Sequence, residues 1–255
     1  MKEQQVFNFQ QQKEIELFSK RNQKLLWQLD SLNDALDHVF SHTPIADKEH
    51  ITIFMLGRRC ANDFAEICLL GSNGFGFAAM MILRSMFEKL VDATYLHLNP
   101  TEIDSFWDYN FVALKKLGFE DIAKERDSDW EKKVNSFRGN SGRLQPRWTK
   151  ADLVSVAKKV GLEKYLRQAY YVPNSFIHSS VEEIYMCLKK EEDDSITLID
   201  FENETERSFA DIALGYSWAL IIRVMKLEIE HYNWTDSEAV FQKCFDSYME
   251  YVKPT

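Results

Sequence analysis

The sequence predicts an all-α protein that folds as a mainly antiparallel bundle of about seven to nine helices. Apolar residues recur at helical spacing along most of the chain, and only 9 Gly and 5 Pro interrupt its 255 residues. Hydrophobic residues make up 45% of the chain and aromatic residues 13%, which is enough to fill a large core. We expect a single helical domain over residues 1–255, with N-terminal helices in 1–54, a core in 55–190 and C-terminal helices in 191–255.

The first half of the chain divides into four predicted helical stretches. Pro44 ends the first, a glycine-rich turn ends the second, and Pro100 ends the third. Thr101 and Asp104 resemble a capping box for the fourth. The stretches cover residues 9–40, as one long or one broken helix, then 47–70, 73–99 and 102–124.

The second half of the chain is less regular. Residues 125–148 suit only one short helix, near 130–137, and are a candidate mobile or inserted loop. Asp152 looks like a helix start, while Pro173 predicts a kink or the junction of two helices. Residues 195–201 (SITLIDF) are a β-like patch, either a small hairpin strand or an extended loop. The helices predicted for this half cover 149–160, 163–188, 206–234 and 235–252.

The charge balance narrows the classes of partner. A formal net charge of −9 removes any global basic field for duplex DNA or an anionic membrane. Residues 138–147 (RGNSGRLQPR) are the local exception, and they form either a phosphate contact or a solvated loop. The start of the chain lacks the apolar stretch of a signal peptide, and no uncharged apolar run reaches the roughly 18 residues of a membrane span. We therefore expect a cytoplasmic protein with no membrane partner.

Cysteine and histidine spacing gives no metal motif. The cysteines show neither the CxxC spacing of a zinc site nor the framework of a disulfide-rich domain, so we interpret them as small buried thiols. His38 and His42 have a metal-compatible i, i+4 spacing, but the pattern supplies no third ligand beside them. We expect no cofactor and no metal.

The stretch from 71 to 100 is the most apolar of helical length, yet it carries charge in its middle. Arg84 and Glu88 lie one turn apart, and Asp92 follows on the same arc of the helix. Because this arc is polar only in its middle, we expect Arg84 and Glu88 to face a cleft or a partner helix. The alternative is an exposed i, i+4 ion pair that contributes a few tenths of a kcal/mol.

A second group of reactive side chains follows in residues 171–180 (YVPNSFIHSS). In a helix that starts at the proline, Asn174 and His178 lie one turn apart, Ser175 and Ser179 share the histidine's face, and Tyr171 lies just ahead of it. His178 could transfer a proton near neutral pH, and the others could donate or accept hydrogen bonds. The alternative is structural, with the histidine bonded within the bundle and Asn174 and Ser175 serving as helix-start residues.

Four blocks of sequence resemble those of a bacterial helical family called domain of unknown function 5677. The similarity extends over roughly residues 55–190. The blocks are LRSMFEKLVDATYL (83–96), WDYN (107–110), Trp148 and YVPNSFIHSS (171–180). The resemblance singles out an arginine and a glutamate on one helix and a tyrosine, a serine and a histidine on a later one. In this chain they are Arg84, Glu88, Tyr171, Ser175 and His178.

That family is in turn distantly similar to the all-helical higher eukaryote and prokaryote nucleotide-binding (HEPN) proteins. Active members of this group are metal-independent ribonucleases of toxin and phage-defence systems, and they dimerise to pair two sites over RNA. The resemblance implies a HEPN-like core, RNA or a nucleotide as partner, and a homodimer. Their signature places a histidine five to seven positions after an arginine, and this chain departs from it, so the site would combine Arg84 with His178 from another helix.

Two functions from different classes follow. In the first, a metal-independent endoribonuclease, Arg84 stabilises charge on the phosphate, Glu88 orients Arg84 and His178 moves the proton. The substrate-binding residues are then Tyr171, Asn174, Ser175 and Ser179. In the second, a non-enzymatic interaction or sensor module of a defence or stress operon, the same side chains form a polar network that fixes helix register and the chain acts through a partner protein. Nucleotide or small-metabolite binding in the same cleft is a third alternative.

Overall fold

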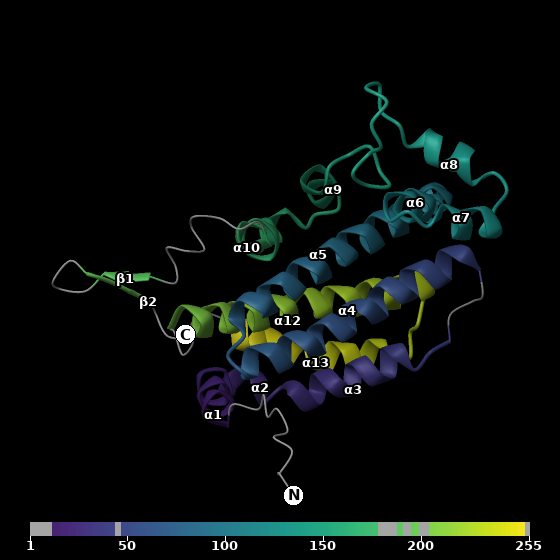
Figure 1. The fold of residues 1–255 in the computed structure, drawn as a ribbon. Helices are drawn as coiled ribbons and strands as arrows, with labels where there is room; N and C mark the ends of the chain where they lie inside the picture. Colours follow the sequence, from purple (N-terminus) through teal and green to yellow (C-terminus); the bar gives the residue numbers. More distant parts are fainter. Residues whose placement is uncertain (1–11, 44–46, 178–187, 191–194, 199–203, 253–255) are drawn as a thin grey trace, which may run out of the picture.

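The computed structural model describes residues 12–43, 47–177, 188–190, 195–198 and 204–252. Its centre is a set of three long helices, α4 (Lys48–Ser72), α5 (Gly76–Leu98) and α12 (Glu204–Tyr232), which pack side by side (Figure 1). One side of this set is covered by α3 (Leu29–Phe40) and α13 (Glu238–Val252), and the other by α9 (Leu153–Lys159) and α10 (Val172–Ile177). The all-α prediction is confirmed.

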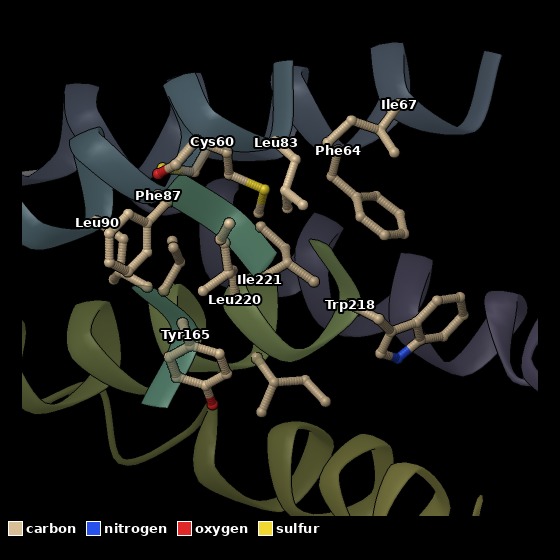
Figure 2. Close-up of a cluster of buried hydrophobic side chains, with 14 of the residues drawn as sticks. Cys60, Phe64, Ile67, Leu83, Phe87, Leu90, Tyr165, Trp218, Leu220 and Ile221 are labelled. Carbon is tan, nitrogen blue, oxygen red and sulfur yellow. The ribbon is translucent and has the colours of Figure 1, made fainter. Parts of the chain in front are cut away.

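The core forms where the apolar faces of α4, α5 and α12 meet. Leu83, Phe87 and Leu90 of α5 are buried against α4 and α12, as Figure 2 shows. Phe64 of α4 packs edge-on against Trp218 of α12, with ring centroids 5.6 Å apart. Each large side chain buried in this way stabilises the fold by about 1.5–3 kcal/mol. Because α5 is buried along its length, its remaining polar face is narrow.

Two glycines let α12 approach its neighbours closely. A Cβ atom at Gly76, the first residue of α5, would lie 1.9 Å from the backbone oxygen of Glu206. At that point the Glu206 carboxylate accepts a hydrogen bond of 2.9 Å from the Phe77 amide, so α12 caps the start of α5. A Cβ atom at Gly57 of α4 would lie 1.9 Å from Oε1 of Glu228. At Gly76 the contact is with backbone, so only glycine fits there, whereas at Gly57 a Cβ atom would displace the Glu228 side chain.

For residues 9–40 the sequence allowed one long helix or one broken helix, and the described part of this stretch is a broken helix. It consists of α1 (Gln12–Arg21), α2 (Gln23–Leu26) and α3, and Pro44 lies outside the described residues. Arg207 of α12 donates two hydrogen bonds to Glu14 of α1, at 2.9 and 2.6 Å. Arg21 forms a second ion pair with Asp211, 2.7 Å between Nε and Oδ2. These pairs hold α1 against α12.

The helix predicted for 102–124 is divided in two. A 3-10 turn, η1 (Pro100–Glu102), leads into α6 (Ile103–Lys116), and Gly118 with φ of +77° separates α6 from α7 (Glu120–Arg126). The capping box predicted at Thr101 and Asp104 is wrong, because the 3-10 turn takes up Thr101 and α6 begins without a side-chain cap.

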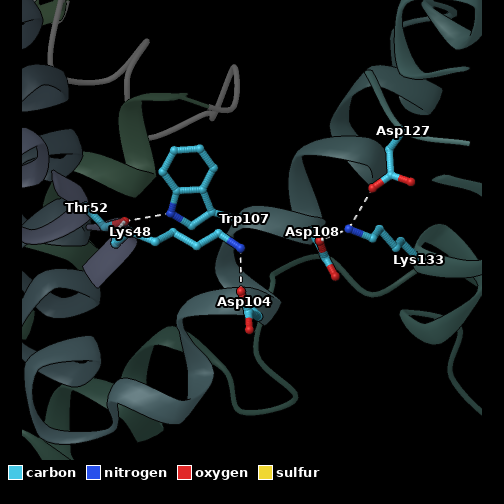
Figure 3. Close-up of polar contacts among 7 residues, drawn as sticks. All are labelled: Lys48, Thr52, Asp104, Trp107, Asp108, Asp127 and Lys133. Carbon is cyan, nitrogen blue, oxygen red and sulfur yellow. Dashed lines mark hydrogen bonds and ion pairs between the residues drawn. The ribbon is translucent and has the colours of Figure 1, made fainter. Parts of the chain in front are cut away.

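Part of the stretch 125–148 is folded and has its own small core. It contains α8 (Trp130–Ser136), whose Trp130 and Val134 are buried against residues of α6. Lys133 of α8 binds Asp108 of α6 and Asp127, at 2.8 and 2.9 Å (Figure 3). This unit is therefore an inserted helical layer that packs along α6.

Hydrogen bonds attach the inserted layer to the central helices. The Trp107 indole of α6 donates to the Thr52 hydroxyl of α4 at 2.6 Å, and Lys48 forms an ion pair with Asp104 (Figure 3). Trp148 is buried between Tyr95 of α5 and Phe106 of α6. The layer is thus fixed at the end of α5, beside the polar face of that helix.

The following segment changes helix type repeatedly. Asp152 caps α9 by accepting from the Ser155 amide at 2.8 Å, which confirms the predicted start. The 3-10 turn η2 (Glu163–Tyr165) and the π-helical turn η3 (Arg167–Tyr171) then lead into α10. Pro173 lies in the first turn of α10, where a missing amide hydrogen is tolerated, so it marks the predicted junction of two helices.

A short hairpin separates this segment from α12. Strand β1 (Leu188–Lys190) pairs antiparallel with β2 (Ile196–Leu198), and Lys189 lies opposite Thr197. The hairpin alternative is confirmed for Ile196–Leu198, residues 199–201 lie outside the described residues, and Leu188 lies in a strand and not in the predicted helix. The described residues contain twelve α-helices, more than the predicted seven to nine, because several have only one or two turns. Among these helices, none is long and apolar enough to cross a membrane.

Candidate ligand cleft on the polar face of α5

Arg84 and Glu88 form an ion pair in the middle of α5. Their Nε and Oε1 atoms are 3.0 Å apart, and the side chains are 22% and 39% exposed. The Arg84 guanidinium also lies over the ring of Tyr170 in η3, 5.1 Å from its centroid. Such a cation–π contact contributes about 0.5–2 kcal/mol and fixes the plane of the guanidinium. The pair is thus held between two elements and is not a freely exposed surface pair.

A second ion pair follows one turn later on the same face. Asp92 of α5 binds Arg147, which comes from the connection after α8. The side chains are 18% and 19% exposed. Burial raises the pKa of Asp92 to about 6, while the charge of Arg147 and the side chain of Trp148 oppose this rise. The Arg147 guanidinium is therefore what keeps this carboxylate ionised at neutral pH.

The two ion pairs line one cleft of about 510 Å³, a size in the range of small-molecule sites. Aromatic side chains of three elements contribute to its walls. Three cationic and three acidic side chains line it, so its formal charge is zero. The lining residues that carry charge or an aromatic ring are Arg84, Glu88, Asp92, Tyr109, Arg147, Trp148, Lys150, Asp152 and Tyr170.

The described residues bring together only part of the predicted site. Arg84 and Glu88 line the cleft as predicted, but Tyr171 is 51% exposed and lies outside the lining set, where its neighbour Tyr170 takes the place expected for it. Asn174 and Ser175 do not line the cleft either. The Ser175 hydroxyl donates to the Val172 carbonyl at 2.7 Å within α10, a bond inside its own helix that differs from the cap expected of a helix-start residue.

His178 and Ser179 lie outside the described residues. The meeting of Arg84 with His178 therefore stays a prediction. What the structure does describe is that α10, which ends one residue before His178, packs against α5.

Sequence patterns missed two contributors to the cleft. Arg147 belongs to the basic segment 138–147, and its charge was visible, but its partner lies 55 positions earlier in the chain. Tyr170 was hidden because a π-helical turn shifts which side chains share a face. The composition of the sequence thus pointed to the segment that contains Arg147. No sequence pattern identified Asp92 as its partner or Tyr170 as a lining residue.

A buried acid lies elsewhere, between α12 and α4. Glu228 is 0% exposed, and neither carboxylate oxygen has a hydrogen-bond partner among the described residues. Burial raises the pKa of this carboxyl to about 8. The group is thus mostly neutral at pH 7 and does not face the cleft.

The sequence predicted no metal site, and the pattern supplied no third ligand beside His38 and His42. In the cleft, the carboxylates of Glu88 and Asp92 are each paired with an arginine. The described group whose ligand atoms are close enough to share a metal ion is His38, His42 and Asp236, far from the cleft in sequence. Cys60 and Cys244 are free and buried thiols, as expected, whereas the free Cys68 is only partly buried and Cys187 lies outside the described residues.

The fold and the cleft define an all-α protein whose central helix carries a polar, ion-paired site. The chain matches the family described as Family of unknown function (DUF5677) over residues 50–196, and it belongs to that family. This confirms the family that the sequence blocks indicated. Neither the curated proteins nor the solved structures include a match to this chain.

The cleft lies entirely within the matched range, since its lining runs from Arg84 to Tyr170. A larger hollow of about 950 Å³ lies between α1, α12 and α13, but most of its lining falls outside residues 50–196. The matched part of the chain therefore contains the whole lining of the cleft but only Lys164 and Tyr165 from the lining of the larger hollow.

Proposed function

We propose that this protein is a non-enzymatic helical sensor module that binds a nucleotide-sized anionic ligand in the α5 cleft and reports its presence to a partner protein. The observation that carries the proposal is the pairing of both cleft arginines with carboxylates of α5. Because the cleft is formally neutral, it offers little attraction for a polyanion such as RNA. A small ligand can still bind by exchanging partners with one arginine.

Arg84 is the group expected to receive the anionic part of the ligand. A guanidinium carries five N–H donors, and Glu88 is the acidic partner that contacts it among the described residues. The remaining donors suit a carboxylate or phosphate. The ring of Tyr170 holds the guanidinium plane in place, so little side-chain entropy is lost on binding.

Calorimetric titration with AMP, ADP, ATP and inorganic phosphate tests this function. We expect at least one nucleotide to bind, Arg84→Gln to weaken that binding at least tenfold, and Arg223→Gln to leave it unchanged. Arg223 is an exposed arginine of α12 and serves as the matched control. If none of these ligands binds, or if both variants bind equally well, the cleft is not the site proposed.

A HEPN-like, metal-independent endoribonuclease of a toxin or phage-defence system is the second candidate. It is favoured by the packing of α10 against α5, because the chain reaches position 178 directly after α10. Arg84 would then stabilise the phosphate charge while His178 transfers the proton, in a homodimer that pairs two sites. Incubation with labelled RNA in EDTA decides the matter. No cleavage, or cleavage undiminished by His178→Ala, excludes the nuclease.

A further inference from the structure

Two histidines and an aspartate converge at the end of α3. His38 and His42 lie one turn apart there, and Asp236 lies in the connection between α12 and α13. Oδ2 of Asp236 is 3.1 Å from Nε2 of His42 and 4.0 Å from Nε2 of His38. All three ligand atoms are within 4.8 Å of one another. Segments nearly 200 positions apart in the chain thus supply one cluster.

The hydrogen bonds of His42 determine which ring nitrogen carries a proton. Its Nδ1 lies 2.9 Å from the His38 carbonyl oxygen and 3.2 Å from that of Val39. A carbonyl oxygen only accepts, so Nδ1 must be the donor. In the neutral ring Nε2 then has a lone pair, which faces the Asp236 carboxylate. Two acceptors at 3.1 Å repel each other unless a cation, a proton or a metal ion, lies between them.

His38 points to the metal ion rather than the proton. Its Nε2 is shielded from solvent and has no hydrogen-bond partner among the described residues. A buried unpaired nitrogen is costly, and a single proton between His42 and Asp236 would leave it unpaired. An ion shared by the three side chains satisfies both ring nitrogens and the carboxylate together.

We propose that His38, His42 and Asp236 bind a divalent transition-metal ion, with Zn²⁺ as the preferred species. Two imidazoles and one carboxylate suit zinc, whereas calcium and magnesium prefer oxygen ligands alone. Zinc bonds of about 2.0–2.1 Å in a tetrahedron separate ligand atoms by about 3.3 Å. The 3.1 Å separation fits this value, and a small rotation of His38 closes the 4.0 Å separation.

The surroundings prepare the site and leave it accessible. The His42 ring stacks on Trp234 with centroids 4.4 Å apart and planes 20° apart, which fixes its orientation. The carbonyl contacts at Nδ1 direct Nε2 outward, an arrangement typical of metal-binding histidines. Asp236 is 65% exposed, so an ion can enter and a water molecule can take the fourth position.

The site lies outside the family-matched range of 50–196 and apart from the α5 cleft. Its consequence is structural, because a bound ion would join α3 to the start of α13. The two helices already pack against each other. Metal binding should therefore stabilise the folded protein independently of any ligand in the cleft.

Cobalt and zinc titrations of the EDTA-treated, dialysed full-length chain test the site. We expect one equivalent of Co²⁺ to give the visible absorption of a tetrahedral nitrogen and oxygen site, Zn²⁺ to displace it, and Zn²⁺ to raise the melting temperature. Asp236→Asn should weaken binding more than tenfold, because even loss of a supporting contact costs about 10–100-fold. Asp236 is exposed, so this variant should still fold.

Glu238→Gln is the matched control, since it removes an exposed carboxylate two positions away. It should bind both metals as the wild type does. Absence of the cobalt absorption, or equal affinity in Asp236→Asn and the wild type, overturns the site. So does a loss of binding in His231→Gln with none in Asp236→Asn, because the ion would then occupy a different histidine group, in which Nδ1 of His231 lies 2.9 Å from Nδ1 of His97 and its ring lies 5.0 Å from that of His50.

Discussion

Replacing Glu228 with glutamine should stabilise the protein above neutral pH, and the structure sets the size of the effect. The carboxyl is 0% exposed, and burial raises its pKa to about 8 from 4.5. The folded state therefore keeps this proton up to pH 8, whereas the unfolded chain releases it near 4.5. Between these values the unfolded state binds fewer protons, so the free energy of unfolding falls as pH rises.

The magnitude follows from proton linkage. Each unit of pKa difference is worth about 1.4 kcal/mol, so Glu228 costs about 3 kcal/mol at pH 7 relative to acid. Over the window from pH 6.5 to 8, part of which this figure already includes, the loss is about 2 kcal/mol. Glu228→Gln abolishes this loss. Its buried amide has a desolvation cost of about 1–3 kcal/mol, so the net gain is largest at the alkaline end of the window.

The measurement is best made between pH 6.5 and 8, because other buried groups change the stability at lower pH. Burial lowers the pKa of His231 to about 4, with the charges of His97 and His50 acting in the same direction, so its contribution to stability grows with pH only up to about 6.5. Asp92, with its pKa raised to about 6, acts in the opposite sense below that value. Between pH 6.5 and 8 the difference between variant and wild type therefore isolates Glu228.

Urea denaturation followed by circular dichroism, at half-unit steps from pH 6.5 to 8, measures the effect. We expect the wild type to lose stability along this series relative to Glu228→Gln. Glu230→Gln is the control, because Glu230 lies on the same helix, is 56% exposed and pairs with Lys226. Parallel pH profiles for wild type and Glu228→Gln would refute the reasoning, since the buried carboxyl would then titrate at its ordinary value.

Three further predictions concern packing and the cleft. Gly76→Ala should lower the free energy of unfolding by about 1–3 kcal/mol, because its Cβ would meet the α12 backbone, whereas Gly215→Ala, with open space around its Cβ, should cost nothing in the same urea experiment. Arg147→Ala should cost about 3–5 kcal/mol by leaving the Asp92 carboxylate unpaired, and adding Asp92→Asn should recover much of it. Arg84→Ala should cost less, about 1 kcal/mol, because Glu88 is more exposed, and an unchanged melting temperature would argue against a structural network.

The sequence was most informative about local structure. Apolar spacing located the central helices α4, α5 and α12, and the side chain of Asp152 marked the start of α9. The charged interruption at Arg84 and Glu88 indicated a cleft before any partner was known. These features depend on residues within a few turns of one another, so the helical period is enough to predict them.

The same local reasoning failed where the backbone forms a 3-10 or a π-helical turn in place of a regular α-helix. Thr101 matched a capping pattern, yet the chain forms a 3-10 turn there. Tyr171 was expected at the site, but the π-helical turn before α10 places Tyr170 there instead. One extra residue in a helical turn rotates every later side chain around the helix axis, and the apolar repeat of the sequence does not reveal where such a turn occurs.

What the sequence by itself determined is the family, the helical elements and the polar face of α5. Only the tertiary structure decided that Arg147 pairs with Asp92, that Glu228 is buried against Gly57, and that Asp236 reaches two histidines of α3. Each of these contacts joins segments that are distant in the chain. Their distances are set by how helices cross and where connections run, and a helical repeat carries information about one helix alone.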